Sequence, residues 1–239
     1  MEITDIQIRS LSEMAIYISF GNTISPKIHQ QVRAVSDYVE THPFAGYEEC
    51  VVSYTAVTIL YDPFLVRTKE KVDNAQKFVQ TYAKQAVQHT DLNSLSENHD
   101  VIIPVCYGGD YGPDLEEAAK TLKMTPEEVV RIHTSGTYLV YMIGFCPGYP
   151  YMGGLDKRLW IPRRKTPRLA IPARSVAIAG QQAGVYPIET PGGWHLLGRS
   201  AVDLFTPDND TPSLLQAGDI VHFKAIGEEE YKQIRGDKA

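Results

Sequence analysis

Residues 137–155 read TYLVYMIGFCPGYPYMGGL, a β-rich apolar run followed at once by a stretch that mixes glycine, proline and aromatic residues. Glycine tolerates positive φ and proline fixes φ, so the second half of this stretch predicts a shaped loop. Aromatic rings on such a loop need a surface to cover. Phe145, Tyr149 and Tyr151 therefore either plug the end of a barrel or wall a pocket whose ligand makes apolar contacts.

Similar short apolar runs follow this loop. They are punctuated by glycine and proline and read SVAIAG, AGVYP, WHLLGRS, AVDLFTP and DIVHFKAI. Many short strands separated by such breakers are typical of a closed barrel or a sandwich. Upstream, VIIPVCY predicts one more strand, and two short helices are predicted to begin at Pro113 and at the Thr125–Glu128 capping box.

The N-terminal part of the chain has a different pattern, which predicts the element order β-β-α-β-β-α. Alternating apolar residues predict strands over 3–9 and 14–20, and Ser25 with Pro26 signals the start of a helix. The runs EECVVSY and AVTILYD predict two further strands. A second amphipathic helix is predicted from Thr68 to Val87.

The polar stretch at residues 90–98 is rich in asparagine and serine, which indicates a linker. A chain of 239 residues with 43% hydrophobic content is long enough for two modest domains. The sequence therefore predicts an α+β protein. We expect a small N-terminal α/β domain at 1–89, a linker at 90–98 and a β-barrel domain at 99–239.

The three cysteines are widely spaced and show no C-x-x-C pattern, so we expect neither a disulfide framework nor a structural zinc site. Three widely spaced cysteines without a disulfide pattern fit a protein of a reducing compartment. The N-terminus lacks a basic segment followed by an apolar one, and no run approaches the length of about 18 apolar residues typical of a membrane span. These features predict a soluble cytoplasmic protein without a membrane partner.

The charge is distributed unevenly. The net charge is −6, yet seven of the 23 basic residues and none of the 29 acidic residues lie between Lys157 and Ile188. An acidic chain argues against a nucleic-acid binder, whose domain is expected to be basic as a whole. The basic segment instead indicates a local anion site. Arg164, Arg168 and Arg174 are candidate anion clamps, with a solvated basic edge strand as the alternative.

Other candidate residues are open to two interpretations. Cys146 is either a nucleophile, which would need a base and a lowered pKa, or an inert cysteine packed under the loop. His133, near the end of a predicted helix, is either a functional donor or a histidine stabilised by the helix dipole. No phosphate-cradling motif of the G-x-x-x-x-G-K-[ST] type is present in the sequence.

Three sequence blocks, which occur in a fixed order, resemble a known family and bear on the function of these candidate residues. GFCPGYPYMGGL, PRRKTPRLAIPARSVAIAGQQAGVYP and TPGGWHLLGRS closely resemble the signature blocks of the allophanate hydrolase subunit 1 family. That family includes the B-type subunit of 5-oxoprolinase and the sporulation antikinase KipI, and the resemblance covers both halves of the chain. It implies an N-terminal α/β domain and a C-terminal cyclophilin-like β-barrel.

The resemblance also implies a function, namely that of one subunit of an ATP-dependent 5-oxoprolinase, a hydrolase that opens the lactam of 5-oxoproline to glutamate. We expect such a subunit to be inactive alone. It would act with a cyclophilin-fold partner, the C-type subunit, together with a third, A-type subunit. ATP would be the cofactor, with no metal site in this chain. The alternative is a regulatory protein that binds and inhibits a sporulation sensor histidine kinase.

We expect site residues at positions that match the family pattern and, in addition, at Tyr149, Tyr151 and Arg164 of the aromatic loop and the basic segment. We expect Arg168 as an anion clamp, His133 as a general acid or donor, and Gln181 with Tyr186 as orienting hydrogen-bond partners. The positions expected to contact substrate are Phe145, Pro147, Gly148, Tyr149, Pro172, Ser175 and Trp194. Pro191, Gly192 and Gly193 also match the family pattern. The positions expected to contact a partner protein are Tyr149, Tyr151 and Arg164.

Overall fold

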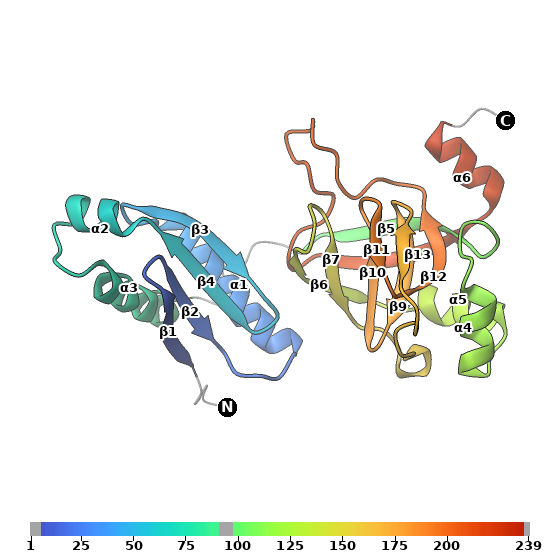
Figure 1. Ribbon diagram of the computed structural model, residues 1–239, viewed down its shortest axis with the longest axis horizontal. Helices are drawn as coiled ribbons and strands as arrows, with labels where there is room; N and C mark the ends of the chain where they lie inside the picture. The colour runs from blue at the N-terminus through green and yellow to red at the C-terminus, as the bar shows by residue number, and fades with distance from the viewer. Residues whose placement is uncertain (1–5, 91–97, 237–239) are drawn as a thin grey trace. The chain divides into compact units, whose positions relative to one another are not determined.

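The computed structural model describes residues 6–90 and 98–236, and the chain divides into two compact units, residues 1–97 and 98–239 (Figure 1). Most of the expected linker, residues 91–97, lies outside the described residues, so its linker character stays a prediction. No helix in the described ranges has both the length and the apolar character needed to cross a membrane.

The N-terminal unit is a four-stranded antiparallel sheet in the order β1-β2-β4-β3 with its helices packed on one face. The strands are β1 (Gln7–Ser12), β2 (Ala15–Ser19), β3 (Tyr47–Val52) and β4 (Ala56–Tyr61), and the helices are α1 (Pro26–Thr41), α2 (Pro63–Lys69) and α3 (Ala75–His89). Alternate residues of the central strands, such as Ile16 and Ile59, pack against Val32 and Val79 of the helices. Ser25 caps α1, as its sequence signal predicts.

The single helix expected from Thr68 to Val87 is two helices in the structure. Lys71 has a φ of 54°, and the Asn74 side chain starts α3 by accepting a hydrogen bond from the Lys77 backbone N–H. Val72 lies in the turn but still packs against the core, so the apolar spacing continues across the break. The single-helix prediction was therefore wrong.

The C-terminal unit is a closed seven-stranded barrel in the order β10-β7-β6-β13-β5-β12-β9, which confirms the predicted barrel (Figure 1). Its strands are β5 (Asp100–Tyr107), β6 (Tyr138–Ile143), β7 (Pro150–Gly153), β9 (Ser175–Ala179), β10 (Gln182–Val185), β12 (His195–Ser200) and β13 (Ile220–Ile226). A separate hairpin is formed by β8 (Arg168–Ile171) and β11 (Thr190–Gly192). The helices are α4 (Leu115–Leu122), α5 (Pro126–Thr134) and α6 (Glu228–Arg235), with a short 3₁₀ turn, η1, at Lys157–Leu159.

One predicted strand is absent from this barrel. Residues 201–207, AVDLFTP, form bends and turns, and their only ladder contact among the described residues is an isolated bridge between Phe205 and Ser213. Ala201 and Leu204 are buried, at 1% and 0% exposed. The run is apolar because it covers the core, and it does not join the sheet.

His133 lies in the core of the barrel unit. Helix α5 turns Val129, Ile132 and His133 inward together, and the His133 side chain is fully buried. Its ring centroid lies 4.5 Å from that of Phe223, and its Nδ1 lies 2.8 Å from the Tyr107 hydroxyl oxygen. Burial lowers the pKa of His133 to about 3, so the imidazole is neutral at pH 7.

A buried carboxylate holds several segments of this unit together. Asp114, 2% exposed, accepts hydrogen bonds from Arg164 Nη1 at 2.8 Å and from both Arg168 Nη1 and Nη2, at 2.7 and 2.6 Å. It also accepts from the Leu196 backbone N–H at 2.8 Å, while its own N–H donates to the Leu196 carbonyl. The start of α4 is thereby tied to β12 and to the basic segment.

Replacing Asp114 is expected to destabilise the barrel unit strongly. Asp114→Ala leaves Arg168 and the buried Leu196 N–H without their acceptor and removes one of the two carboxylates that hold Arg164, and breaking such a pair costs about 3–5 kcal/mol. Urea unfolding followed by tryptophan fluorescence reports on this unit alone, because Trp160 and Trp194 are the two tryptophans of the chain. Glu230→Ala is the matched control, since its pair with Lys224 is exposed and contributes about 1 kcal/mol or less. Equal losses in both variants would contradict this account.

Because the pKa of His133 is lowered in the folded chain, the barrel unit is expected to lose stability as the pH falls below about 6.5. Its pKa is about 3 when folded and 6.5 ordinarily. Between these values the unfolded chain binds a proton that the folded chain excludes, so stability falls as pH decreases. From about pH 6.5 to pH 5 this amounts to about 2 kcal/mol.

The check is urea unfolding across that pH range, again by tryptophan fluorescence. His133→Gln should show a shallower dependence of unfolding free energy on pH than the unsubstituted chain. His222→Gln, at a partly exposed position of β13, should keep the original slope. An unaltered slope in His133→Gln would remove His133 as the source.

Candidate functional site

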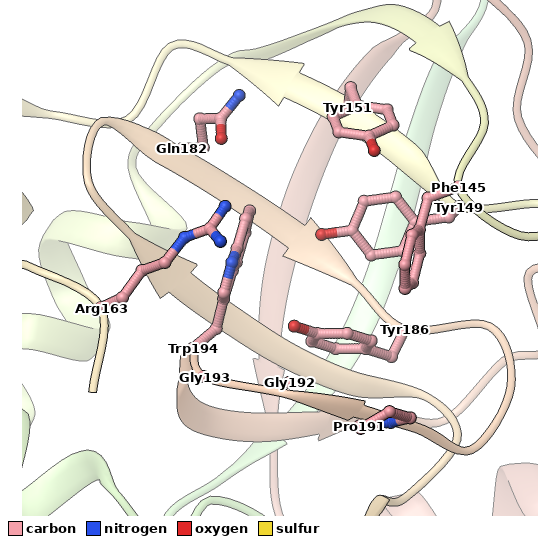
Figure 2. A pocket seen from close by; sticks show the side chains of 10 residues that line it. All are labelled: Phe145, Tyr149, Tyr151, Arg163, Gln182, Tyr186, Pro191, Gly192, Gly193 and Trp194. Carbon is pink, nitrogen blue, oxygen red and sulfur yellow. The ribbon is translucent and has the colours of Figure 1, made fainter. Parts of the chain in front are cut away.

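The loop at 144–149 and three neighbouring segments of the barrel unit enclose a pocket of about 240 Å³ (Figure 2). Its lining residues are Phe145, Tyr149, Tyr151, Arg163, Gln182, Tyr186, Pro191, Gly192, Gly193 and Trp194. They come from the loop and β7, from the segment after η1, from β10 and the turn that follows it, and from β11 with the residues that lead into β12. Segments distant in sequence therefore meet at this one place.

Packed aromatic rings form the wall of the pocket. Tyr149 meets Tyr151, Tyr186 and Trp194 edge to face, with centroid distances of 5.2, 5.4 and 6.4 Å. Tyr149 and Tyr186 are each 3% exposed and belong to one buried hydrophobic cluster, and this packing fixes the position of the wall. The sequence allowed the rings either to plug the end of the barrel or to wall a pocket, and in the structure they wall a pocket.

Two glycines make this arrangement possible. A Cβ at Gly184 of β10 would lie 2.7 Å from the Tyr149 hydroxyl oxygen and 3.1 Å from the Trp194 ring. A Cβ at Gly192 would lie 2.9 Å from the Tyr186 hydroxyl oxygen. Only glycine lets the backbone approach these rings so closely.

The polar groups of the pocket are one cation and several neutral groups. Figure 2 shows the Arg163 side chain reaching toward the Trp194 ring, with the hydroxyls of Tyr149 and Tyr186 also directed into the space between the rings. Among the described residues, Arg163 has no carboxylate within 4.0 Å. Burial raises the pKa of Tyr186 to about 12 although the charge of Arg163 acts in the opposite direction, so this hydroxyl is protonated at pH 7.

This lining suits binding and orientation more than proton transfer. Burial raises the pKa of the nearby Cys146 thiol, so the thiolate needed for nucleophilic attack is disfavoured, and the side chain packs under the aromatic wall. Within the described residues, no group of three or more His, Cys, Asp or Glu side chains could hold a metal ion. The pocket offers ring surfaces, hydroxyl and amide groups and a guanidinium, which together fit a small ring compound that carries an anionic group.

Several residues expected from the sequence meet in this pocket. They are Phe145, Tyr149, Tyr151, Tyr186, Pro191, Gly192, Gly193 and Trp194. Others lie beside it in structural positions. Pro147 is exposed on the loop, and a Cβ at Gly148, whose φ is +77°, would lie 2.7 Å from the Phe205 Cβ. Pro172 and Ser175 form the turn before β9, where the Ser175 hydroxyl donates to the Pro172 carbonyl at 2.7 Å.

The four residues expected to act in catalysis are dispersed. Tyr186 lines the pocket, whereas His133 is buried in the core and Arg168 is held in its bidentate pair with Asp114. Gln181 is an exposed residue of the turn between β9 and β10 and does not line the pocket. Arg164, expected at a partner surface, is bound by Asp114 and Glu117.

Sequence reasoning missed Arg163, Gln182 and Gly184. Strand alternation was the available signal for two of them, because Gln182 and Gly184 share one face of β10 while Gln181 precedes the strand. Arg163 has no carboxylate partner among the described residues, whereas its neighbour Arg164 is bound by Asp114, and the sequence carried no sign of this difference.

The chain is similar to known proteins over most of its length. The family described as "Carboxyltransferase domain, subdomain C and D" matches residues 6–215. The 5-oxoprolinase B subunit of Bacillus subtilis (strain 168) is 45% identical over 230 residues, covering 94% of this chain and 95% of that protein.

Two solved structures extend this comparison. The crystal structure of TTHA0988 has a TM-score of 0.76 and 31% identity, and it covers 92% of this chain, which spans 40% of that one. The urea carboxylase of Kluyveromyces lactis, at 18% identity and a TM-score of 0.73, covers 97% of this chain, which spans 23% of that one, and it shares the fold. With a family match over most of its length and a relative at 45% identity, this chain belongs to the carboxyltransferase subdomain C and D family.

Proposed function

We propose that this chain is one subunit of an ATP-dependent 5-oxoprolinase and that its aromatic pocket binds 5-oxoproline. The observation that carries the proposal is the pairing of an aromatic wall with Arg163, a guanidinium that has no carboxylate partner within the described residues. The name of the Bacillus subtilis relative supports the same reaction. A protein with that name acts with other subunits, and we propose partners of the C type and the A type. The cytoplasmic location stays a prediction.

The pocket matches this substrate in size and chemistry. Its volume of about 240 Å³ lies below the range of about 300–1,000 Å³ that is usual for drug-sized ligands. A five-membered lactam would rest against Tyr149, Tyr186 and Trp194, and its carboxylate would accept hydrogen bonds from Arg163.

ATP is the cosubstrate in this proposal, but a pocket of this size suits the lactam and not a whole nucleotide. We therefore assign the adenosine part of ATP to the partner subunits. Tyr186, protonated at pH 7, would donate a hydrogen bond to the lactam carbonyl and would not remove a proton. This chain then binds and orients the amide, and the group that activates its oxygen comes from outside the aromatic pocket.

The alternative function, inhibition of a sporulation sensor histidine kinase, stays an untested prediction. An inhibitor that docks through the aromatic loop would present its rings on a convex surface. Tyr149 and Trp194, at 3% and 6% exposed, line a concave pocket instead. Phe145 is 64% exposed, which leaves one ring of the loop open to solvent. This geometry favours the substrate pocket.

Removing the guanidinium of Arg163 is expected to weaken 5-oxoproline binding. Arg163→Ala should raise the KM for 5-oxoproline about ten- to hundredfold, because a charge-assisted hydrogen bond contributes about 1.5–3 kcal/mol. Arg163→Lys should fall between, since lysine keeps the charge without the bidentate geometry. The measurement is 5-oxoproline-dependent ATP hydrolysis by the complex assembled with its A-type and C-type partners.

The matched control is Arg158→Ala. Arg158 belongs to the same basic segment, lies outside the pocket and pairs with Asp156 at 2.7 Å. It should leave the KM unchanged. If Arg163→Ala assembles normally and keeps the original KM, Arg163 does not bind the substrate carboxylate.

A further inference from the structure

A second pocket lies next to the aromatic one and shares Arg163 with it. Its volume is about 470 Å³, and it is lined by α4, by residues 161–166 and by His195 of β12. Its lining contains no Phe, Tyr or Trp. A ligand here would find charges and polar groups, and the His195 imidazole is the one aromatic ring in the lining.

The backbone that carries the basic side chains of this pocket is fixed on both sides of Arg163. Ile161 forms a bridge with Gly180, and the Pro162 carbonyl accepts a hydrogen bond from His195 Nε2 at 2.9 Å. The Arg164 backbone N–H donates to the Gly193 carbonyl at 2.8 Å. Because the segment is already held in place, little ordering entropy would be lost when a ligand binds.

The positive charges of this pocket exceed the negative ones. Glu117 is neutralised by Arg164, whose Nη1 lies 2.8 Å from the Glu117 carboxylate. Arg164 is also held by Asp114. Over the described ranges, neither Arg163 nor Lys165 has a carboxylate within 4.0 Å. Two unpaired cations therefore remain at the pocket, beside the hydroxyl-bearing residue Thr166.

His195 contributes a second, independent feature. It is 6% exposed and lines this pocket, and a carbonyl oxygen only accepts hydrogen bonds, so Nε2 must carry the proton donated to Pro162. Nδ1 is buried without a hydrogen-bond partner in the described part of the chain. A polar ring nitrogen buried without a partner is costly in a folded protein, and an N–H at this position would donate a hydrogen bond to an oxyanion.

We infer that this second pocket is a binding site for a phosphate-class oxyanion. Two unpaired cations match a doubly charged anion, and lysine and arginine are the usual phosphate ligands. A cationic lining without Phe, Tyr or Trp favours a phosphate or a terminal phosphoryl group over a ring compound. Arg163 would face this anion on one side and the aromatic pocket on the other. The origin of the phosphate in the cell rests on the proposed function, but its binding does not.

The test titrates the full-length chain alone with potassium phosphate, ADP and ATP by isothermal calorimetry, against sodium chloride of equal ionic strength. Lys165→Gln is expected to weaken phosphate binding about tenfold through the loss of one charge-assisted contact. Lys157→Gln, which removes a charge from the same basic segment outside the pocket, should bind as the unsubstituted chain does. Thr166→Ala is a second variant that keeps every charge and should weaken binding by less.

Each result of this titration identifies the source of the phosphate or contradicts the inference. Tighter binding of ATP than of phosphate, with the same loss in Lys165→Gln, would identify a nucleotide phosphoryl group as the source, and the reverse order would identify the free ion. No phosphate binding, or equal affinity in Lys165→Gln, would overturn the inference. Because this assay needs no partner protein, such a failure would leave the 5-oxoproline proposal standing, and failure of the Arg163 kinetics would leave phosphate binding standing.

Discussion

The buried carboxylate of Asp114 is the constraint on which the site depends. It accepts hydrogen bonds from Arg164, from both terminal nitrogens of Arg168 and from the Leu196 backbone. A carboxylate that is 2% exposed is costly to desolvate unless such donors surround it, so separating the three segments would leave a buried polar group without its partners. That requirement places the segment between Pro162 and Arg168 against β12, where both pockets are formed.

The same pairing decides which basic residues are open to a ligand. The sequence shows seven cations between Lys157 and Ile188 without one acidic residue. In the folded chain, carboxylates from outside this segment bind Arg164, Arg168 and Arg174. Arg163 and Lys165 keep their charge without such a partner among the described residues. Part of the basic segment therefore has a structural role through these ion pairs, and Arg163 and Lys165 are left for the anion sites that we propose.

The sequence predicted features that depend on residues close together in the chain, and it did not predict features that depend on residues far apart. Strand texture, the Ser25 cap and the clustering of Tyr149 and Tyr151 are local features, and they predicted the barrel, the first helix and the aromatic wall. The Asp114–Arg168 pair joins residues 54 positions apart, so nothing local marked Arg168 as paired and Arg163 as open. His133 shares a buried face of α5 with Val129 and Ile132, and this spacing was the signal for its place in the core. Gln181 precedes β10 and does not line the pocket, and the catalytic roles expected for both residues stay predictions.

The position of Arg163 between two pockets also limits how they can work together. A single guanidinium that bonds a carboxylate in the aromatic pocket cannot also neutralise a doubly charged anion in the neighbouring one. Without another cation, filling either pocket would weaken binding in the other. Lys165 lines only the polar pocket, so it can still offset part of the charge of the second anion while Arg163 holds the first. Because the aromatic pocket has no Asp, Glu, His or Lys among its lining residues, the role that we propose for this arrangement of charges is to bring a phosphoryl group close to the amide of 5-oxoproline.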